Sequence, residues 1–270
     1  MFKKISSLVR KKNQPDVITF TGGMGAQIIS AAIYFQKKIE GKPAYADLKY
    51  FDQKPTLAKE GKKGEISHWD WQLEIFGLRP EEFNSNPDFN NRNSNYLFDG
   101  VDKLELGLNA LSIKEVKDYF KLPAEPVGTL LNWLQSEFLC VHIRRGDYIN
   151  VASHLVSNEN FLDLIEKFRN LIQNIVVISD SPIEEEFQSK ISHMYKRAEF
   201  LDKTNANTAH CIMRLAKVLI CSNSQFSLAA AALNNKALVM IPSRWYGFSE
   251  RHLEMPLHAR CGFQIFDNIS

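Results

Sequence analysis

The chain has 270 residues, 44% of them hydrophobic and 24% charged, which is an ordinary globular composition with room for one large or two small domains. Its net charge of +2 argues against nucleic-acid binding, which usually requires a strongly basic surface. The four cysteines show no spacing typical of a zinc site or a disulfide framework, which fits a reducing compartment. Without a membrane-spanning apolar run or a signal-peptide core, the sequence predicts a cytoplasmic protein.

The first segment, residues 1–14, carries five basic side chains between apolar ones. This spacing suits a short amphipathic helix in peripheral contact with the anionic inner face of a membrane. A solvated basic tail is the simpler interpretation of the same residues.

Residues 16–48 have the pattern of a strand, a glycine turn, a helix and a second strand, which is a βαβ unit. In such a turn, backbone N–H groups at a helix N-terminus can approach an anion or a sugar closely, so Gly23 and Gly25 are candidate binding residues. A dinucleotide site is the less favoured alternative. Asp47 stands where a ribose-binding acid would lie, but Ile28 occupies the place of the third small residue.

The rest of the first half is less informative. In the aromatic segment 66–78, His68 or Trp69 could stack on a sugar, although such side chains more often belong to a core. Ser112 is expected to cap a helix within residues 104–119. Pro123 and Pro126 mark the predicted boundary between an N-terminal domain, residues 15–126, and a C-terminal domain, residues 127–270.

Residues 138–148 dominate the second half. A buried strand over residues 139–143 runs directly into Arg144, Arg145, Gly146 and Asp147, and parallel sheets bind ligands at such strand ends. Neighbouring arginines point in different directions, so we expect one to face a ligand and the other to be held by the protein. A guanidinium suits phosphate oxygens, and Asp147 could orient it. A surface ion pair is the alternative interpretation.

Strands and helices then alternate, with strands at 175–179, 217–221 and 237–241 and helices at 160–170, at 209–216 and from Gln225 onward. The turn before the last helix is a candidate anion site, and ordinary N-capping would produce the same pattern. Its residues are Ser222, Asn223, Ser224, Gln225 and Phe226.

Six segments carry a family resemblance: the glycine turn 22–27, residues 71–78, the H-I-R-R-G-D-Y run 142–148, the Ser-Asp pair 179–180, the S-N-S-Q-F-S run 222–227 and the P-S-R-W-Y run 242–246. In this order they resemble motifs of the α-1,2-fucosyltransferase family and its fucosyltransferase relatives.

The resemblance implies a GT-B fold, in which two Rossmann-like α/β domains face a central cleft and the C-terminal domain holds the nucleotide-sugar donor. It implies an inverting fucosyltransferase that uses GDP-fucose and a sugar hydroxyl as acceptor. His142 would contact the base or ribose. Negative charge develops on the β-phosphate of the departing diphosphate, and Arg144 together with the 222–227 turn would stabilise that charge. No D-x-D-type carboxylate cluster follows a strand, so no metal ion and no further cofactor are expected.

The general base is not apparent from the sequence. Asp147, His154 and Glu159 are the nearest titratable groups after the arginines. His154 is the favoured catalytic base because an imidazole titrates near the working pH, and Asp147 suits a structural role better.

Two positions depart from the family. Ala26 replaces an asparagine that lies at the reaction centre in relatives, and Ala209 stands where an acid is usual. The neighbouring His210 would either replace that acid in binding the nucleotide or point into the core. The sequence thus predicts a glycosyltransferase, most simply an α-1,2-fucosyltransferase acting on a surface polysaccharide or a lipid-linked oligosaccharide. Use of another nucleotide-sugar donor and a defunct nucleotide-sugar or glycan-binding protein are the alternatives.

Overall fold

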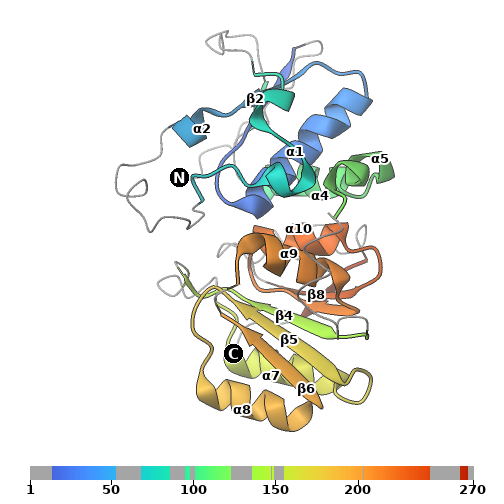
Figure 1. The fold of residues 1–270 in the computed structure, drawn as a ribbon. Helices are drawn as coiled ribbons and strands as arrows, with labels where there is room; N and C mark the ends of the chain where they lie inside the picture. The colour runs from blue at the N-terminus through green and yellow to red at the C-terminus, as the bar shows by residue number, and fades with distance from the viewer. Residues whose placement is uncertain are drawn as a thin grey trace, which may run out of the picture.

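In the computed structural model, the chain forms two parallel β-sheets, one in each half of the sequence (Figure 1). The structure describes residues 14–52, 68–85, 95–97, 101–122, 136–146, 148, 155–202, 204–243 and 262–266. Nearly all of the basic segment and the predicted domain boundary at Pro123 and Pro126 lie outside these residues.

The N-terminal sheet has the strand order β2-β1-β3, and both pairs are parallel. Helix α1 connects β1 to β2, so the predicted βαβ unit is confirmed. Apolar residues surround α1 on most sides because the helix packs against the sheet, α4 and α10. The elements of this half are β1 (Asp16–Thr19), α1 (Met24–Ile39), β2 (Ala44–Asp47), α2 (Lys49–Asp52), η1 (Leu73–Phe76), η2 (Pro80–Glu82), β3 (Asn95–Leu97), α4 (Val101–Ala110), α5 (Lys114–Lys117) and η3 (Asp118–Phe120).

The predicted capping by Ser112 is wrong. Helix α5 begins after Ile113, which has no side-chain cap. The Ser112 hydroxyl instead donates to the carbonyl oxygen of Asn109 at 2.6 Å, because it directly follows the last turn of α4.

The C-terminal sheet has six parallel strands in the order β6-β5-β4-β7-β8-β9. If the strands are renumbered from β4, the order is 3-2-1-4-5-6, which is that of dinucleotide-binding Rossmann sheets. Such sheets bind their ligand where the strand order reverses. In this chain, that point lies between the carboxyl ends of β4 and β7. The α/β class predicted from the sequence is confirmed. The elements are β4 (Leu139–Ile143), α7 (Asn158–Phe168), β5 (Asn174–Ser179), α8 (Glu185–Met194), β6 (Arg197–Leu201), α9 (Ala206–Leu215), β7 (Val218–Ile220), α10 (Gln225–Leu233), β8 (Leu238–Pro242) and β9 (Gln264–Phe266).

The helices of this half cover both faces of the sheet. Successive side chains of β4 point to opposite faces of the sheet and belong to two different hydrophobic clusters. Val141 packs in the cluster with α7 and α8, and Cys140 packs in the cluster with α9 and α10. Figure 1 shows α7 and α8 below the sheet and α9 and α10 above it, with α1, α4 and α5 above α10.

The cluster on the α10 side extends without a break into the core of the N-terminal half. Two polar contacts reinforce this junction: Arg214 Nη1 donates to the carbonyl oxygen of Phe120 at 2.6 Å, and Lys117 Nζ donates to Asn235 Oδ1 at 2.6 Å. The two halves therefore share one hydrophobic core.

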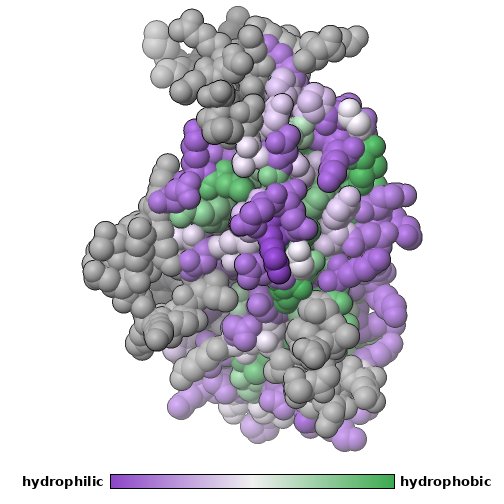
Figure 2. Space-filling model, turned by 45° about the horizontal axis from the view of Figure 1, so that its top comes forward, coloured by the Kyte–Doolittle hydropathy of each residue, from purple (hydrophilic) through white to green (hydrophobic). Residues whose placement is uncertain are grey.

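On the face drawn in Figure 2, hydrophobic residues form small separate groups among hydrophilic ones. None of the helices in the described parts of the chain is long and apolar enough to span a bilayer.

Candidate functional site

Arg145 is held firmly by the start of α7. Its Nη1 donates to the carbonyl oxygen of Val156 and its Nη2 to Asn158 Oδ1, both at 2.8 Å, and the guanidinium lies 6.0 Å from the centre of the Phe161 ring. Burial lowers the pKa of Arg145. The guanidinium of Arg145 is thus bound by groups at the start of α7.

Arg144 points elsewhere, and 35% of its side chain is exposed. Its Nη1 lies 2.8 Å from Asp180 Oδ2, just beyond the end of β5, and its guanidinium carbon lies 5.3 Å from the centre of the Tyr148 ring. No role for Asp180 was predicted from the sequence. The available signal was that polar residues directly follow β4 and β5, and parallel pairing brings these two strand ends to one edge of the sheet. Asp147 and His154, the predicted catalytic residues beside Arg144, lie outside the described residues.

His142 is buried and connects the two strands that flank the predicted crevice. Its Nδ1 lies 2.9 Å from the Ser222 hydroxyl, and its ring centre lies 5.6 Å from that of Phe226. Burial, reinforced by the charge of Arg144, lowers the pKa of His142 to about 3, so the ring is neutral at physiological pH. The predicted contact of His142 with a base or ribose stays a prediction.

The serines of the 222–227 turn bind groups within the turn and its neighbours. The Ser224 hydroxyl accepts a hydrogen bond from the amide of Phe226 at 3.3 Å and so caps α10. The Ser227 hydroxyl donates to the carbonyl oxygens of Ser222 and Ser224. Ser222, Asn223 and Ser224 are buried, whereas Gln225 and Phe226 are partly exposed. N-capping, the alternative interpretation of this turn, is therefore present at Ser224, and anion binding by these five residues stays a prediction.

The glycine turn is held by two glutamine side chains. Gln27 Nε2 donates to the carbonyl oxygens of Gly22 and Asp70, both at 2.8 Å, and Gln27 Oε1 accepts from the amide of Gln72. Gln72 Oε1 in turn accepts from the amide of Met24 at 3.1 Å. Gly22, with φ of 69°, adopts the left-handed conformation that favours glycine. The turn is thus built into the N-terminal half together with segment 70–72.

Gly25 lies against the start of α10. A Cβ atom at this position would lie 2.4 Å from the amide nitrogen of Phe226, closer than any real contact. The first turns of α1 and α10 therefore meet, and neither contains an acidic residue. On the opposite face of the sheet, the first turns of α7 and α8 do contain glutamates. No acidic residue of either first turn neutralises the partial positive charge of these two helix ends, which suits an anion.

His210 is buried between two aromatic rings, and its predicted contact with the nucleotide stays a prediction. It is 0% exposed, and its ring centre lies 5.8 Å from that of Phe76 and 5.7 Å from that of Phe226. Neither ring nitrogen has a hydrogen-bond partner among the described residues. Burial, reinforced by Arg214, lowers the pKa of His210. Ala209 beside it is only 3% exposed, so a nucleotide contact by either residue would require neighbouring side chains to move.

The aromatic segment divides between core and surface. Trp71 packs against the core and its Nε1 donates to the carbonyl oxygen of Leu78 at 2.8 Å. The ring of Trp69 stacks on that of Tyr50 with 4.3 Å between centres, and His68 is exposed. A sugar contact at His68 or Trp69 stays a prediction.

Within the described residues, no group of three or more His, Cys, Asp or Glu side chains could hold a metal ion. Cys140, Cys211 and Cys221 are buried free thiols.

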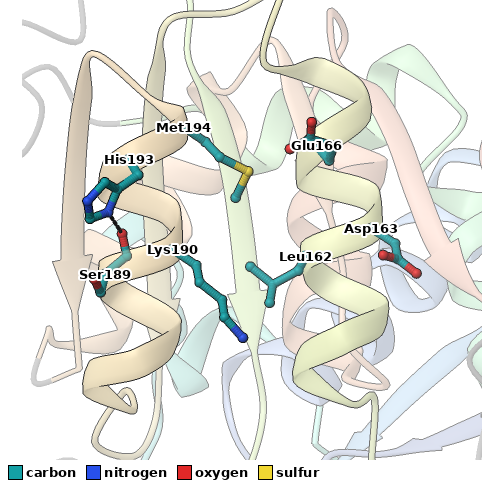
Figure 3. Close-up of a pocket in the computed structure, with 7 residues that line it drawn as sticks. All are labelled: Leu162, Asp163, Glu166, Ser189, Lys190, His193 and Met194. Carbon is teal, nitrogen blue, oxygen red and sulfur yellow. Dashed lines mark hydrogen bonds between the residues drawn. The ribbon is translucent and has the colours of Figure 1, made fainter.

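A groove lies between α7 and α8 (Figure 3). Leu162 and Met194 face each other across it, and His193 Nδ1 lies 2.6 Å from the carbonyl oxygen of Ser189. The other lining residues are Asp163, Glu166 and Lys190. None of the candidate residues from the sequence lines this groove, and it belongs to the side of the sheet opposite α9 and α10.

No curated protein matches the chain. Among solved structures, it is similar to POFUT1 in complex with GDP-fucose, at 12% identity and a TM-score of 0.48 over 85% of this chain and 97% of that one. It is also similar to the E. coli heptosyltransferase WaaC with ADP, at 11% identity and a TM-score of 0.49 over 94% of this chain and 93% of that one. A third is the E. coli ADP-heptose LPS heptosyltransferase II, at 9% identity and a TM-score of 0.44 over 88% of each chain.

A family model matches the region that contains Arg144, the 222–227 turn and all strands from β4 to β8. This region spans residues 126–255, the model is that of glycosyl transferase family 11, and the match supports a glycosyltransferase.

Proposed function

We propose that the chain is an inverting glycosyltransferase that holds a nucleotide-sugar donor at the carboxyl ends of β4 and β7. The observation that carries this proposal is the position of Arg144, a partly exposed cation at the point where the strand order of a Rossmann-type sheet reverses. The family 11 match covers the same strands. The two parallel sheets, one in each half, suit a GT-B-like arrangement in which the N-terminal half receives the acceptor.

The chemistry suits these groups. When a sugar leaves a nucleotide sugar, negative charge develops on the β-phosphate, and fixed positive groups lower the energy of that transition state. The Arg144 guanidinium provides a permanent charge and directed N–H groups. The converging N-termini of α1 and α10 add partial positive charge near this edge. In this proposal, these groups take the role that a metal ion has in other transferases.

The donor in this proposal is GDP-fucose, and the acceptor is a sugar hydroxyl of a surface polysaccharide or a lipid-linked oligosaccharide, joined in α-1,2 linkage. An inverting transfer requires a base that removes the proton from this hydroxyl. His154 remains the proposed base, with Asp147 as the alternative. The protein would act in the cytoplasm, where its basic N-terminal segment would touch the inner face of the membrane.

Ala26 favours a second candidate function. It lies in the first turn of α1 and is partly exposed, and its methyl group cannot form a hydrogen bond. If a polar side chain is required there, the protein would bind a nucleotide sugar or a glycan without transferring the sugar. Hydrolysis of GDP-fucose in the absence of acceptor distinguishes a transferase from a protein that only binds, because an intact catalytic centre transfers the sugar slowly to water.

The proposal is tested by calorimetric titration of GDP, UDP and ADP into the wild type, Arg144→Ala and the control Arg169→Ala. Arg169 is an exposed arginine that pairs with Glu166 after the end of α7. Loss of a charge-assisted contact costs about 1.5–3 kcal/mol, so Arg144→Ala should bind GDP roughly 10 to 150 times more weakly. Arg169→Ala should bind it as the wild type does. Equal affinity of the wild type and Arg144→Ala for all three nucleotides would refute the proposed donor site.

A further inference from the structure

We infer that Asp180 is a positioning residue, which holds Arg144 in the orientation needed for the donor diphosphate, and that Gly146 makes room for it. This inference rests on the proposed function, since the ligand of Arg144 is the proposed diphosphate.

Asp180 binds the end of β4 at two points. Its Oδ2 lies 2.8 Å from Arg144 Nη1, and its Oδ1 accepts from the backbone amide of Arg145 at 2.8 Å. The next residue along, Ser181, accepts a hydrogen bond from the amide of Gly146 at 3.2 Å. The residues after β5 thus fix both the backbone after β4 and the guanidinium of Arg144.

Gly146 is needed for space and not for its backbone angles, because its φ is not positive. A Cβ atom there would lie 2.5 Å from Asp180 Oδ2, the oxygen that binds Arg144. That oxygen ends a flexible side chain, so Gly146→Ala should displace the carboxylate while the exposed backbone stays in place. This substitution can therefore break the Arg144–Asp180 contact without changing either residue.

Arg144 and Asp180 are partly exposed, with 35% and 22% of their side-chain areas accessible. A long side chain at such a position has many rotamers available, and holding it in one of them reduces the entropy lost when it binds phosphate. A carboxylate beside an arginine can also compete with an anionic ligand for that arginine, and removal of Asp180 would then raise the affinity for GDP. The sign of the change in affinity distinguishes positioning from competition.

The test measures GDP affinity by calorimetry in Asp180→Ala, Asp180→Asn, Gly146→Ala and the control Glu166→Ala, which removes a carboxylate from the surface pair with Arg169. We expect Asp180→Ala to weaken GDP binding about tenfold or more. Asp180→Asn should weaken it less, because its oxygen can still accept one hydrogen bond. Gly146→Ala should also weaken it, and Glu166→Ala should not. In an Arg144→Ala background, Asp180→Ala and Gly146→Ala should have less than a twofold further effect.

Unchanged or tighter GDP binding by Asp180→Ala would overturn the inference, as would an equal loss in the Arg144→Ala background. A second measurement needs no ligand: NMR of the arginine guanidinium groups should show slow rotation of Arg144 in the wild type and fast rotation in Asp180→Ala and Gly146→Ala. Fast rotation in the wild type would overturn the inference too. If Arg144→Ala alone leaves GDP binding unchanged, the proposed donor site fails, and the rotation measurement still decides whether Asp180 holds Arg144.

Discussion

Gly25→Ala tests the contact between the first turns of α1 and α10. The added Cβ would lie 2.4 Å from the amide nitrogen of Phe226 and 2.5 Å from the carbonyl carbon of Gln225. Ordinary carbon contacts are about 3.5–4.0 Å, so the two helices would have to separate by roughly 1 Å. Both obstructing atoms belong to the backbone, so no rotamer change can relieve the clash.

Two opposing effects set the magnitude. Overpacking costs about 1–3 kcal/mol, and a clash with backbone atoms lies in the upper part of this range, at about 2–3 kcal/mol. Alanine stabilises a helix by about 0.8–1.0 kcal/mol relative to glycine. The free energy of unfolding should therefore fall by about 1–2 kcal/mol, and each kcal/mol lowers the Tm by about 2–4 °C for a chain of this size class.

Urea unfolding followed by circular dichroism and by tryptophan fluorescence measures the change. Gly23→Ala is the matched control, because its Cβ would meet only Gln72 Nε2, at 3.9 Å. Gly23 precedes α1 as its N-cap, where alanine is poorer than glycine, so a loss of about 0.5–1 kcal/mol is expected. If Gly25→Ala is as stable as the wild type or more stable, α1 and α10 do not pack as described, and helix propensity alone determines the outcome.

Three further predictions follow from burial and charge. In the folded protein the pKa of His142 is about 3, well below its ordinary value of 6.5. Between pH 6.5 and pH 3, this histidine is therefore protonated in the unfolded chain and neutral in the folded one. Stability should thus fall by about 2 kcal/mol from pH 7 to pH 5 on account of this residue. An equal pH dependence of urea unfolding in His142→Asn would contradict this. Ala209→Asp should destabilise the fold by about 3 kcal/mol or more, because Ala209 is buried in the shared core. Near-normal thermal unfolding of the variant would show that this turn faces solvent. Sugar transfer, measured by release of GDP, should persist in excess EDTA, and an activity restored only by Mg²⁺ or Mn²⁺ would show that a metal ion has the role assigned to Arg144.

Much of the fold could be predicted because its signals are local. The runs that became β1, β4, β5, β7 and β8 are short and apolar, and glycine or serine turns bound several of them. Helix α8 and strand β6 were not predicted from the sequence. Only Phe187 and Ile191 of α8 are buried, so its apolar pattern is weak, and β6 is a partly exposed edge strand. The three-residue strands β3 and β9 are too short to produce a recognisable pattern.

The candidate site was predictable only in part. The divergence of Arg144 and Arg145 follows from the alternation of side chains along an extended backbone. Asp180 lies 35 residues beyond Arg145, and pairing of β4 with β5 brings the two together. The position of Gly25 against Phe226 likewise depends on how the two halves pack. No spacing along the sequence reports such contacts, since they arise from tertiary structure.

The hydrophobic core shared by the two halves bears on whether either half can exist alone. Residues 229–233 of α10 are apolar and buried, and α10 packs against α1. Removal of the N-terminal half would expose this face to water, and contiguous apolar patches of that kind cause association. Many two-domain proteins can be divided at a linker into soluble pieces, because their interfaces are small and polar. Here we expect a C-terminal fragment to stay soluble only when the N-terminal fragment is produced beside it, as a split protein that reassembles through α1 and α10.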